Sequence, residues 1–193
     1  MQSLGDFQNL FASVGQGFSA LSTGEYASSV FVAAQRITQA LREGRKLMVF
    51  GNGGSAADAQ HICGELVGRF QKNRRGLPAI ALCSDAAVVT AWSNDFSFET
   101  VFARQIEALG NPGDVALGIS TSGNSPNVVC ALERARKLGL VTILLTGAQP
   151  GRACAFSDVV VAAPASTTAR IQEIHLVSYH AICEYVENCL AEQ

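Results

Sequence analysis

Five short apolar runs recur between residues 47 and 163, and longer amphipathic stretches separate most of them. The strands of a parallel sheet are covered on both faces, so they read as continuous apolar runs and not as alternating patterns. Alternation of such runs with helical stretches predicts an α/β fold, a doubly wound five-stranded parallel sheet flanked by helices. The five runs are LMVF, AIAL, VALGI, VTILL and VVVAA.

Apolar residues at helical spacing mark the segments around these runs. The first 44 residues are predicted to be helical, with Gly44 as the stop signal. Two helical pieces, Ala86–Trp92 and Phe98–Leu109, lie between the second and third runs, and a long helix from about Thr168 to Leu190 closes the chain. No repeat or linker indicates a second domain. We therefore expect a single domain over 1–193, with N-terminal helices over 1–44 and an α/β core with a C-terminal helix over 45–193.

Composition limits the partners of the chain. Of its 193 residues, 48% are hydrophobic and 16% charged, and the formal net charge is −2. Such a charge gives no general attraction to nucleic acid or to anionic lipid. The apolar runs are too short to span a bilayer, and the N-terminus lacks the pattern of a secretory signal. We expect a cytoplasmic protein without nucleic-acid or membrane partners. Because the charged residues are few, part of the surface must be apolar, and this favours an oligomer.

The six cysteines are scattered and include no C-x-x-C pair. This distribution fits neither a disulfide framework nor a thiolate zinc site. We expect reduced, buried cysteines at positions 63, 83, 130, 154, 183 and 189.

Residues 51–55, Gly-Asn-Gly-Gly-Ser, follow the first apolar run and are called the glycine loop. Ligands of open parallel sheets bind at the carboxyl ends of strands, near the point where the strand order reverses. Glycines there allow positive φ and close approach of the backbone, and Ser55 is a predicted N-cap for an anion-binding helix start. The alternative is an ordinary tight turn. The loop lacks the G-x-G-x-x-G pattern of dinucleotide sites.

Residues 120–125, Ser-Thr-Ser-Gly-Asn-Ser, follow the third run and are called the hydroxyl loop. Four hydroxyls before a helix that opens with Pro126 can surround a phosphate with neutral donors. The alternative, an N-cap at Ser125, accounts for a single hydroxyl. Since the loop has no lysine or arginine, it favours a phosphomonoester over a triphosphate.

The histidines of the chain fall in two segments. His61 precedes Glu65 by four residues, a spacing that presents both side chains to one metal or else forms a simple surface pair. His175 and His180 lie on the terminal helix with Gln172, among apolar residues where a surface helix would carry lysine and arginine. The two segments are therefore candidates for one metal site.

The segments GNGGSAADAQHICGEL, Asn94-Asp95, LGISTSGNSPN and RIQEIH, followed by His180, occur in this order along nearly the whole chain. Together they resemble the phosphoheptose isomerases, which belong to the larger family of sugar-isomerase (SIS) domains. The resemblance implies the flavodoxin-like SIS fold and a homo-oligomer, a tetramer whose subunits share active sites.

The resemblance also implies roles at the matching positions. Asp58 would orient the His61 ring from one helical turn away. Glu65 and His180 would form the acid–base pair. The phosphate would be held by Ser120, Thr121, Ser122 and Ser125. Other substrate contacts would come from Asn52, Gly53, Gly54, Glu65, Asn94, Asp95 and Gln172. One zinc ion per subunit would be bound by His61, Glu65, Gln172 and His180.

Helix geometry complicates this ligand set. Gln172 and His180 are eight residues apart, which is about 12 Å along a helix axis. Either both side chains lean toward one metal, or the ligands come from different subunits. Imidazole and carboxylate ligands also suit other divalent ions.

The implied reaction converts sedoheptulose 7-phosphate to D-glycero-D-manno-heptose 7-phosphate through an enediol, for lipopolysaccharide or related precursors. Relatives with the same fold act instead as non-catalytic adaptors that bind the bacterial replication initiator. Glu65 and His180 favour the enzyme, because an adaptor needs no acid or base there. An isomerase of pentose or hexose phosphates is set aside by the resemblance alone.

Overall fold

The computed structural model describes residues 3–22 and 24–191, and its centre is a parallel sheet. Within the described residues the sheet has five strands in the order β2-β1-β3-β4-β5, and each pairing is parallel. Every strand coincides with one of the predicted apolar runs, which confirms the predicted sheet. The strands are β1 (Leu47–Gly51), β2 (Ala79–Ala81), β3 (Val115–Ser120), β4 (Val141–Thr146) and β5 (Val159–Ala162).

The strand order reverses between β1 and β3. The chain places β2 on one side of β1 and then crosses to place β3 on the other side. In the register of this pair Gly51 lies opposite Ile119, so the two strands end together. The glycine loop and the hydroxyl loop therefore leave the sheet side by side at its switch point.

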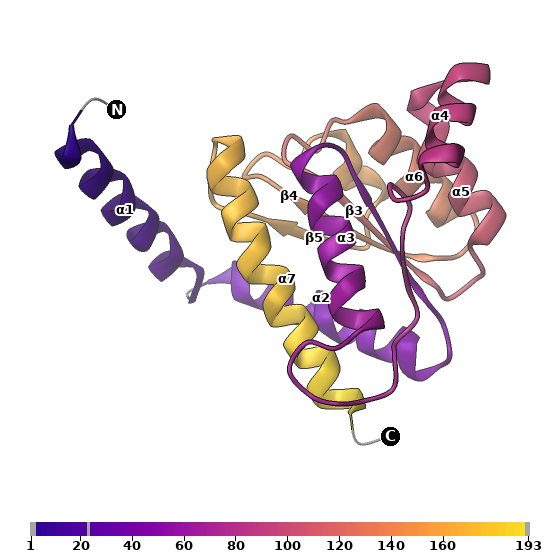
Figure 1. Cartoon of the computed structure of the whole chain (residues 1–193), viewed down its shortest axis with the longest axis horizontal. Helices are drawn as coiled ribbons and strands as arrows, with labels where there is room; N and C mark the ends of the chain where they lie inside the picture. Colours follow the sequence, from indigo (N-terminus) through magenta and orange to yellow (C-terminus); the bar gives the residue numbers. More distant parts are fainter. Residues whose placement is uncertain (1–2, 23, 192–193) are drawn as a thin grey trace.

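Two helical layers cover the sheet, one on each face (Figure 1). Side chains that alternate along the strands pack into separate cores, so that Val49 faces one layer and Phe50 the other. The first layer contains α2 (Glu25–Arg42), α3 (Gly54–Val67) and α7 (Thr168–Leu190). The second contains α5 (Val101–Leu109) and α6 (Pro126–Lys137).

Two helices stand outside these layers. α1 (Leu4–Ser19) projects from the body of the molecule, and α4 (Ala86–Asp95) packs only at its edge (Figure 1). Neither contributes a buried residue to the described chain. Short 3-10 helices complete the fold: η1 (Ala20–Ser22), η2 (Phe98–Thr100) and η3 (Arg152–Phe156). Among the described residues, no helix has the length and hydropathy needed to cross a membrane.

Two local expectations are wrong. Ser55 does not cap α3, because Gly53 adopts φ 56° and turns the chain two residues earlier, which leaves Ser55 buried inside the first turn. All six cysteines are free, as expected, but only Cys63 and Cys183 are buried, and Cys154 is exposed.

Candidate functional site

A pair of asparagine side chains joins the two loops at the switch point. The Asn52 amide donates to Oδ1 of Asn127 at 2.9 Å, and the Asn127 amide donates back to Asn52 at 2.8 Å. Asn127 is 2% exposed, so this reciprocal pair is shielded from water. It holds the glycine loop against the start of α6. Asn127 was missed from sequence because nothing in its local pattern separates it from a helix-start residue.

Hydroxyl groups of the hydroxyl loop face one another. Oγ of Ser120 and Oγ of Ser125 are 2.9 Å apart. Ser125 occupies the N-cap position of α6 but makes no capping hydrogen bond. The simple capping explanation therefore fails for this side chain, whose hydroxyl is turned toward Ser120 at the head of β3. Backbone N–H groups at the start of α6 add the positive end of a helix to this place.

A second loop supports the hydroxyl loop. Gly123 has φ 64°, and a Cβ there would lie 1.7 Å from the carbonyl oxygen of Pro150. The Ala153 N–H donates to the Gly123 carbonyl at 2.9 Å, and Gly147 donates to Thr121 at 3.1 Å. This loop was missed from sequence. The segment GAQPG after the fourth apolar run could have indicated it, since it repeats the pattern of glycines after a strand. A cavity of about 680 Å³ lies between the loops at the carboxyl ends of the strands.

His61, Glu65 and His180 come together on neighbouring faces of α3 and α7. Their candidate ligand atoms all lie within 4.8 Å of one another. Nε2 of His61 is 3.0 Å from Oε1 of Glu65, and the rings of His61 and His180 are 5.1 Å apart. The His61 side chain is 42% exposed, so a small molecule can reach the group from solvent. One chain therefore supplies these three residues, and no exchange of α7 between subunits is needed to assemble them.

Tyr179 connects this group to Asp58. Its hydroxyl lies 3.0 Å from Nδ1 of His61 and donates to Oδ1 of Asp58 at 3.3 Å. When the hydroxyl donates to Asp58, it accepts the Nδ1–H of His61, and the lone pair of Nε2 then faces Glu65. Burial raises the pKa of Tyr179, so the hydroxyl is protonated near neutral pH. Burial also raises the pKa of Asp58, against the hydrogen bond from Tyr179 and the influence of the neighbouring His61 ring.

The donor set of this group fits a divalent metal ion. Two imidazole nitrogens and a carboxylate oxygen are ligands that zinc accepts, with positions left open for substrate. In the tautomer described above, Nε2 of His61 and Oε1 of Glu65 are two electron-pair donors 3.0 Å apart, and a cation between such atoms removes their repulsion. Tyr179 then supplies the outer hydrogen bond that commonly orients a ligating histidine.

Gln172 lies apart from the three other predicted ligands in this structure. A Cβ at Gly54 would lie 2.4 Å from Nε2 of Gln172, so this amide rests on the first residue of α3. His61 is seven residues further along α3, about 10 Å away along the axis. Gln172 therefore lies beside the glycine loop, and its predicted substrate contact stays a prediction. Its role as a metal ligand stays a prediction.

Asn94 and Asp95 are also separate. They end α4, where the Asn94 amide donates to Oδ1 of Asp95 at 3.0 Å and both residues are exposed. α4 contacts α5 and η2, which belong to the other side of the sheet from α7. The candidate site thus consists of the loops at the switch point, the exposed pair on α4 and the group on α3 and α7.

Comparison with known proteins by family model, by sequence and by structure points to one family. The family model of the SIS domain matches residues 11–147. The phosphoheptose isomerase of Aquifex aeolicus (strain VF5) is 51% identical over 168 residues, which is 87% of this chain and 88% of that protein. A solved phosphoheptose isomerase from Francisella tularensis has a TM-score of 0.92 at 35% identity and covers 97% of this chain and 100% of its own. One from Neisseria gonorrhoeae has a TM-score of 0.89 at 38% identity, covering 95% and 97%.

Proposed function

The chain belongs to the SIS domain family and, within it, to the phosphoheptose isomerases. From this membership and the geometry of the site, we propose the role of each site residue in the isomerisation. The function is the aldose–ketose isomerisation of sedoheptulose 7-phosphate to D-glycero-D-manno-heptose 7-phosphate for heptose precursor synthesis. We assign the reaction centre to His61, Glu65 and His180 because their candidate ligand atoms lie together. No observation favours the adaptor function.

The isomerisation needs a base that moves a proton between two adjacent carbons and an acid that serves their oxygens. Glu65 takes the proton as the general base, and its side chain is 21% exposed. His180, on the facing helix, transfers a proton to and from the oxygens. When bound, a zinc ion would polarise the carbonyl and hydroxyl oxygens. His61, Glu65 and His180 would hold it, with Gln172 as the predicted fourth ligand.

The hydroxyl loop binds the phosphate at the far end of the substrate. Ser120, Thr121, Ser122 and Ser125 surround the anion, and the N-terminus of α6 adds its dipole. Binding energy at this end aligns the reacting carbons, which are remote from the phosphate. Asn52, Gly53 and Gly54 contact the sugar between the two ends, with Asn94 and Asp95.

We also propose that the active enzyme is a homo-oligomer, a tetramer by the family resemblance, with shared sites. Glu65 lies eleven residues, or about 16 Å, along α3 from Gly54, so one chain separates the acid–base pair from the glycine loop. The exposure of Asn94 and Asp95 likewise suits residues covered by another subunit. The free cysteines suit a reducing, cytoplasmic location.

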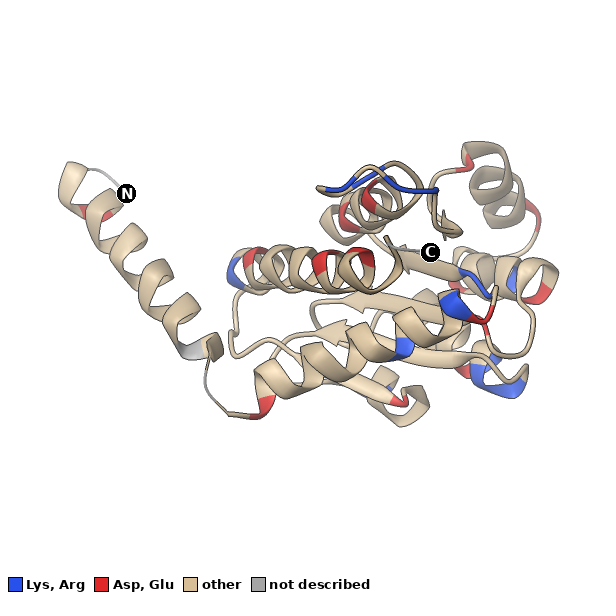
Figure 2. Ribbon diagram, turned by 90° about the horizontal axis from the view of Figure 1, so that it is seen from below, with Lys and Arg blue, Asp and Glu red and all other residues tan. Residues whose placement is uncertain are grey.

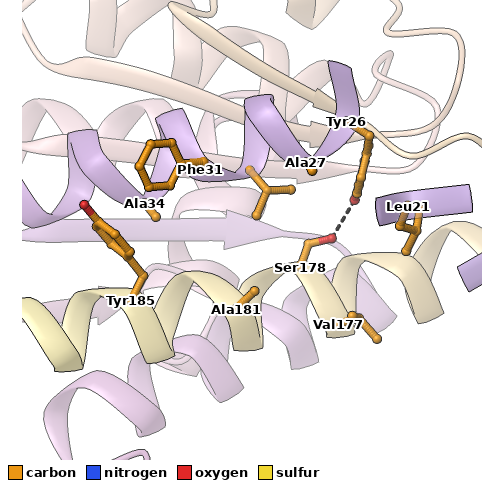
Figure 3. Close-up of a pocket in the computed structure, with 10 residues that line it drawn as sticks. Leu21, Tyr26, Ala27, Phe31, Ala34, Val177, Ser178, Ala181 and Tyr185 are labelled. Carbon is orange, nitrogen blue, oxygen red and sulfur yellow. Dashed lines mark hydrogen bonds between the residues drawn. The ribbon is translucent and has the colours of Figure 1, made fainter. Parts of the chain in front are cut away.

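Two apolar surfaces support association of copies. α1 carries Leu4, Phe7 and Phe11 at 75%, 47% and 69% exposure, and with Val14 and Phe18 they form a stripe at alternating spacings of three and four residues. That spacing is typical of a helix that packs lengthwise against another. A groove of about 300 Å³ between α2 and α7 exposes further apolar side chains, including Val177 (Figure 3).

A subunit-mixing experiment tests the shared site. Glu65→Ala removes the base, and Ser122→Asp places a negative charge where the phosphate binds, so each protein alone should be inactive toward sedoheptulose 7-phosphate. After dissociation and joint reassembly, about one quarter of the sites should receive both intact parts if the parts come from different subunits. Activity should therefore reappear.

The matched control mixes Glu65→Ala with His180→Ala. These residues lie together in one chain, so every hybrid site stays incomplete and the mixture should remain inactive. If subunits exchange fully in the first mixture and no activity returns, Glu65 and the phosphate site of each active site belong to one chain. A wild-type protein that leaves sedoheptulose 7-phosphate unchanged, with or without added zinc, would contradict the isomerase function itself.

A further inference from the structure

A buried carboxylate organises the segment between α3 and β2. Glu187, in the last turns of α7, is 1% exposed. Its Oε1 accepts the N–H of Phe70 at 3.0 Å, and its Oε2 accepts those of Gln71 at 2.7 Å and Lys72 at 2.8 Å. Three successive backbone donors thus converge on one side chain that is more than a hundred residues away in sequence.

Arg74 joins the same carboxylate to the end of α3. Its Nε donates to Oε1 of Glu187 at 3.0 Å, and both side chains are almost fully buried. Its terminal nitrogens donate to the carbonyls of Glu65 at 2.8 Å and Leu66 at 2.9 Å. The guanidinium therefore caps carbonyls that the last turn of a helix leaves without intrahelical partners.

These contacts bear on both residues of the acid–base pair. Arg74 holds the backbone of Glu65 directly. Glu187 fixes the segment that carries Phe70, whose ring lies 5.7 Å from the ring of His180. Burial alone would raise the pKa of Glu187, but the backbone donors and Arg74 hold it below its ordinary value, so the carboxylate is charged near neutral pH.

We propose that Arg74 and Glu187 are positioning residues that set the placement of Glu65 relative to His180. The inference rests on the proposed function for the roles of that pair. Glu65 and His180 stand on different helices, and the Arg74–Glu187 pair links the end of α3 to α7 and to the ring against His180. Neither Arg74 nor Glu187 belongs to the proposed substrate contacts or metal ligands.

The test replaces Arg74 by lysine in the full-length protein. Lysine keeps the charge but lacks the planar fork needed to reach Glu187 and several carbonyls together. We expect kcat to fall by about 10- to 100-fold, because small misplacements of reacting groups have effects of that size. KM should change much less, since the hydroxyl loop is untouched. Affinity for Co²⁺, used as a spectroscopic probe of the His61 group, should fall by about tenfold.

Asp114→Asn is the matched control for lost stability. Like Glu187, Asp114 is buried, with 2% exposure, and accepts from a basic side chain, here Lys46, and from backbone N–H groups. It lies at the amino end of β3, away from the site. At comparable thermal stability this variant should keep normal kcat and Co²⁺ affinity. If Arg74→Lys loses no more of either than Asp114→Asn, the proposal is overturned.

Phe70→Leu covers the case in which Arg74→Lys does not fold. Phe70 is only partly buried, so leucine should preserve the fold while removing the ring beside His180. A reduced kcat and altered Co²⁺ spectrum support the proposal, and unchanged values contradict it. If the wild type has no isomerase activity, the proposed function fails, and Co²⁺ affinity across these variants still decides whether the pair positions Glu65 and His180.

Discussion

The Tyr179 hydroxyl is the least expected participant in the candidate site. The sequence indicated Asp58 as the residue that orients His61, and the structure inserts Tyr179 between them. Tyr179 is 118 residues from His61 along the chain, and its position among the apolar residues of a buried helix is typical of a core residue. A single sequence contains no signal for a contact of that separation.

Tyr179→Phe isolates the role of this hydroxyl. Phenylalanine fills the same space, so the fold should persist, while His61 loses the partner that fixes its tautomer. We expect Zn²⁺ affinity, measured by calorimetry, to fall by about 10- to 100-fold, the usual effect of removing an outer hydrogen bond to a ligand.

Tyr26→Phe provides the comparison. The Tyr26 hydroxyl forms a hydrogen bond with Ser178, the residue next to Tyr179 on α7. This hydrogen bond lies in the groove between α2 and α7 and does not involve His61 (Figure 3). This variant should bind Zn²⁺ like the wild type. Equal losses in the two variants would mean that both act through the stability of α7 and not through His61.

At the scale of elements, the strands were predictable and the turns were less so. Each predicted run became a strand. In β1 and β3, burial on both faces leaves a continuous apolar signature, whereas the edge strand β2 is only partly buried. The predicted start of α3 was wrong because Gly53 turns the chain before Ser55. The sequence alone does not show which glycine adopts a positive φ. The GAQPG support of the hydroxyl loop and the Asn52–Asn127 pair depend on packing between loops, which strand and helix patterns do not encode.

The amino ends of the strands supply a prediction on pH. Burial alone would raise the pKa of Asp114, but the Lys46 side chain and the N–H groups of Lys46 and Asn111 hold it below its ordinary value. Its contribution to stability is therefore present above about pH 4 and lost as the pH falls through the lower folded-state pKa. Asp114→Asn should lower the free energy of unfolding by about 1–3 kcal/mol at pH 7.

Urea unfolding at neutral and acidic pH checks this expectation. The difference between wild type and variant should shrink as the pH falls below about 4 and through the lower folded-state pKa of Asp114, because the wild-type carboxyl is then protonated as well. A difference that is the same at both pH values would show that the charge of Asp114 contributes nothing and that only its shape matters.

For the whole molecule, α1 is the feature that a single chain leaves unexplained. It carries one charged residue, Asp6, and extends away from the body, on which most of the other charged residues lie (Figure 2). We expect Phe7→Glu/Phe11→Glu to reduce the mass of the particle in solution and to lower specific activity. Charges in the apolar stripe oppose helix packing, whereas the body retains its own cores. Light scattering after size-exclusion chromatography measures the mass.

Asn9→Glu/Gln16→Glu adds the same charge to the opposite face of α1, where both residues are exposed. This control should keep the mass and activity of the wild type. If the stripe variant also keeps its mass, α1 does not mediate association and the groove between α2 and α7 becomes the surface to examine.

The contact between Gly54 and Gln172 also limits how this sequence can vary. Any side chain at position 54 would occupy the space now filled by the Gln172 amide, since a Cβ there falls 2.4 Å from Nε2. We therefore expect the residues at these two positions, which are more than a hundred residues apart in sequence, to change together. Among relatives, glycine at 54 should persist wherever glutamine stands at 172, and a shorter residue at 172 should be the condition under which alanine at 54 is tolerated.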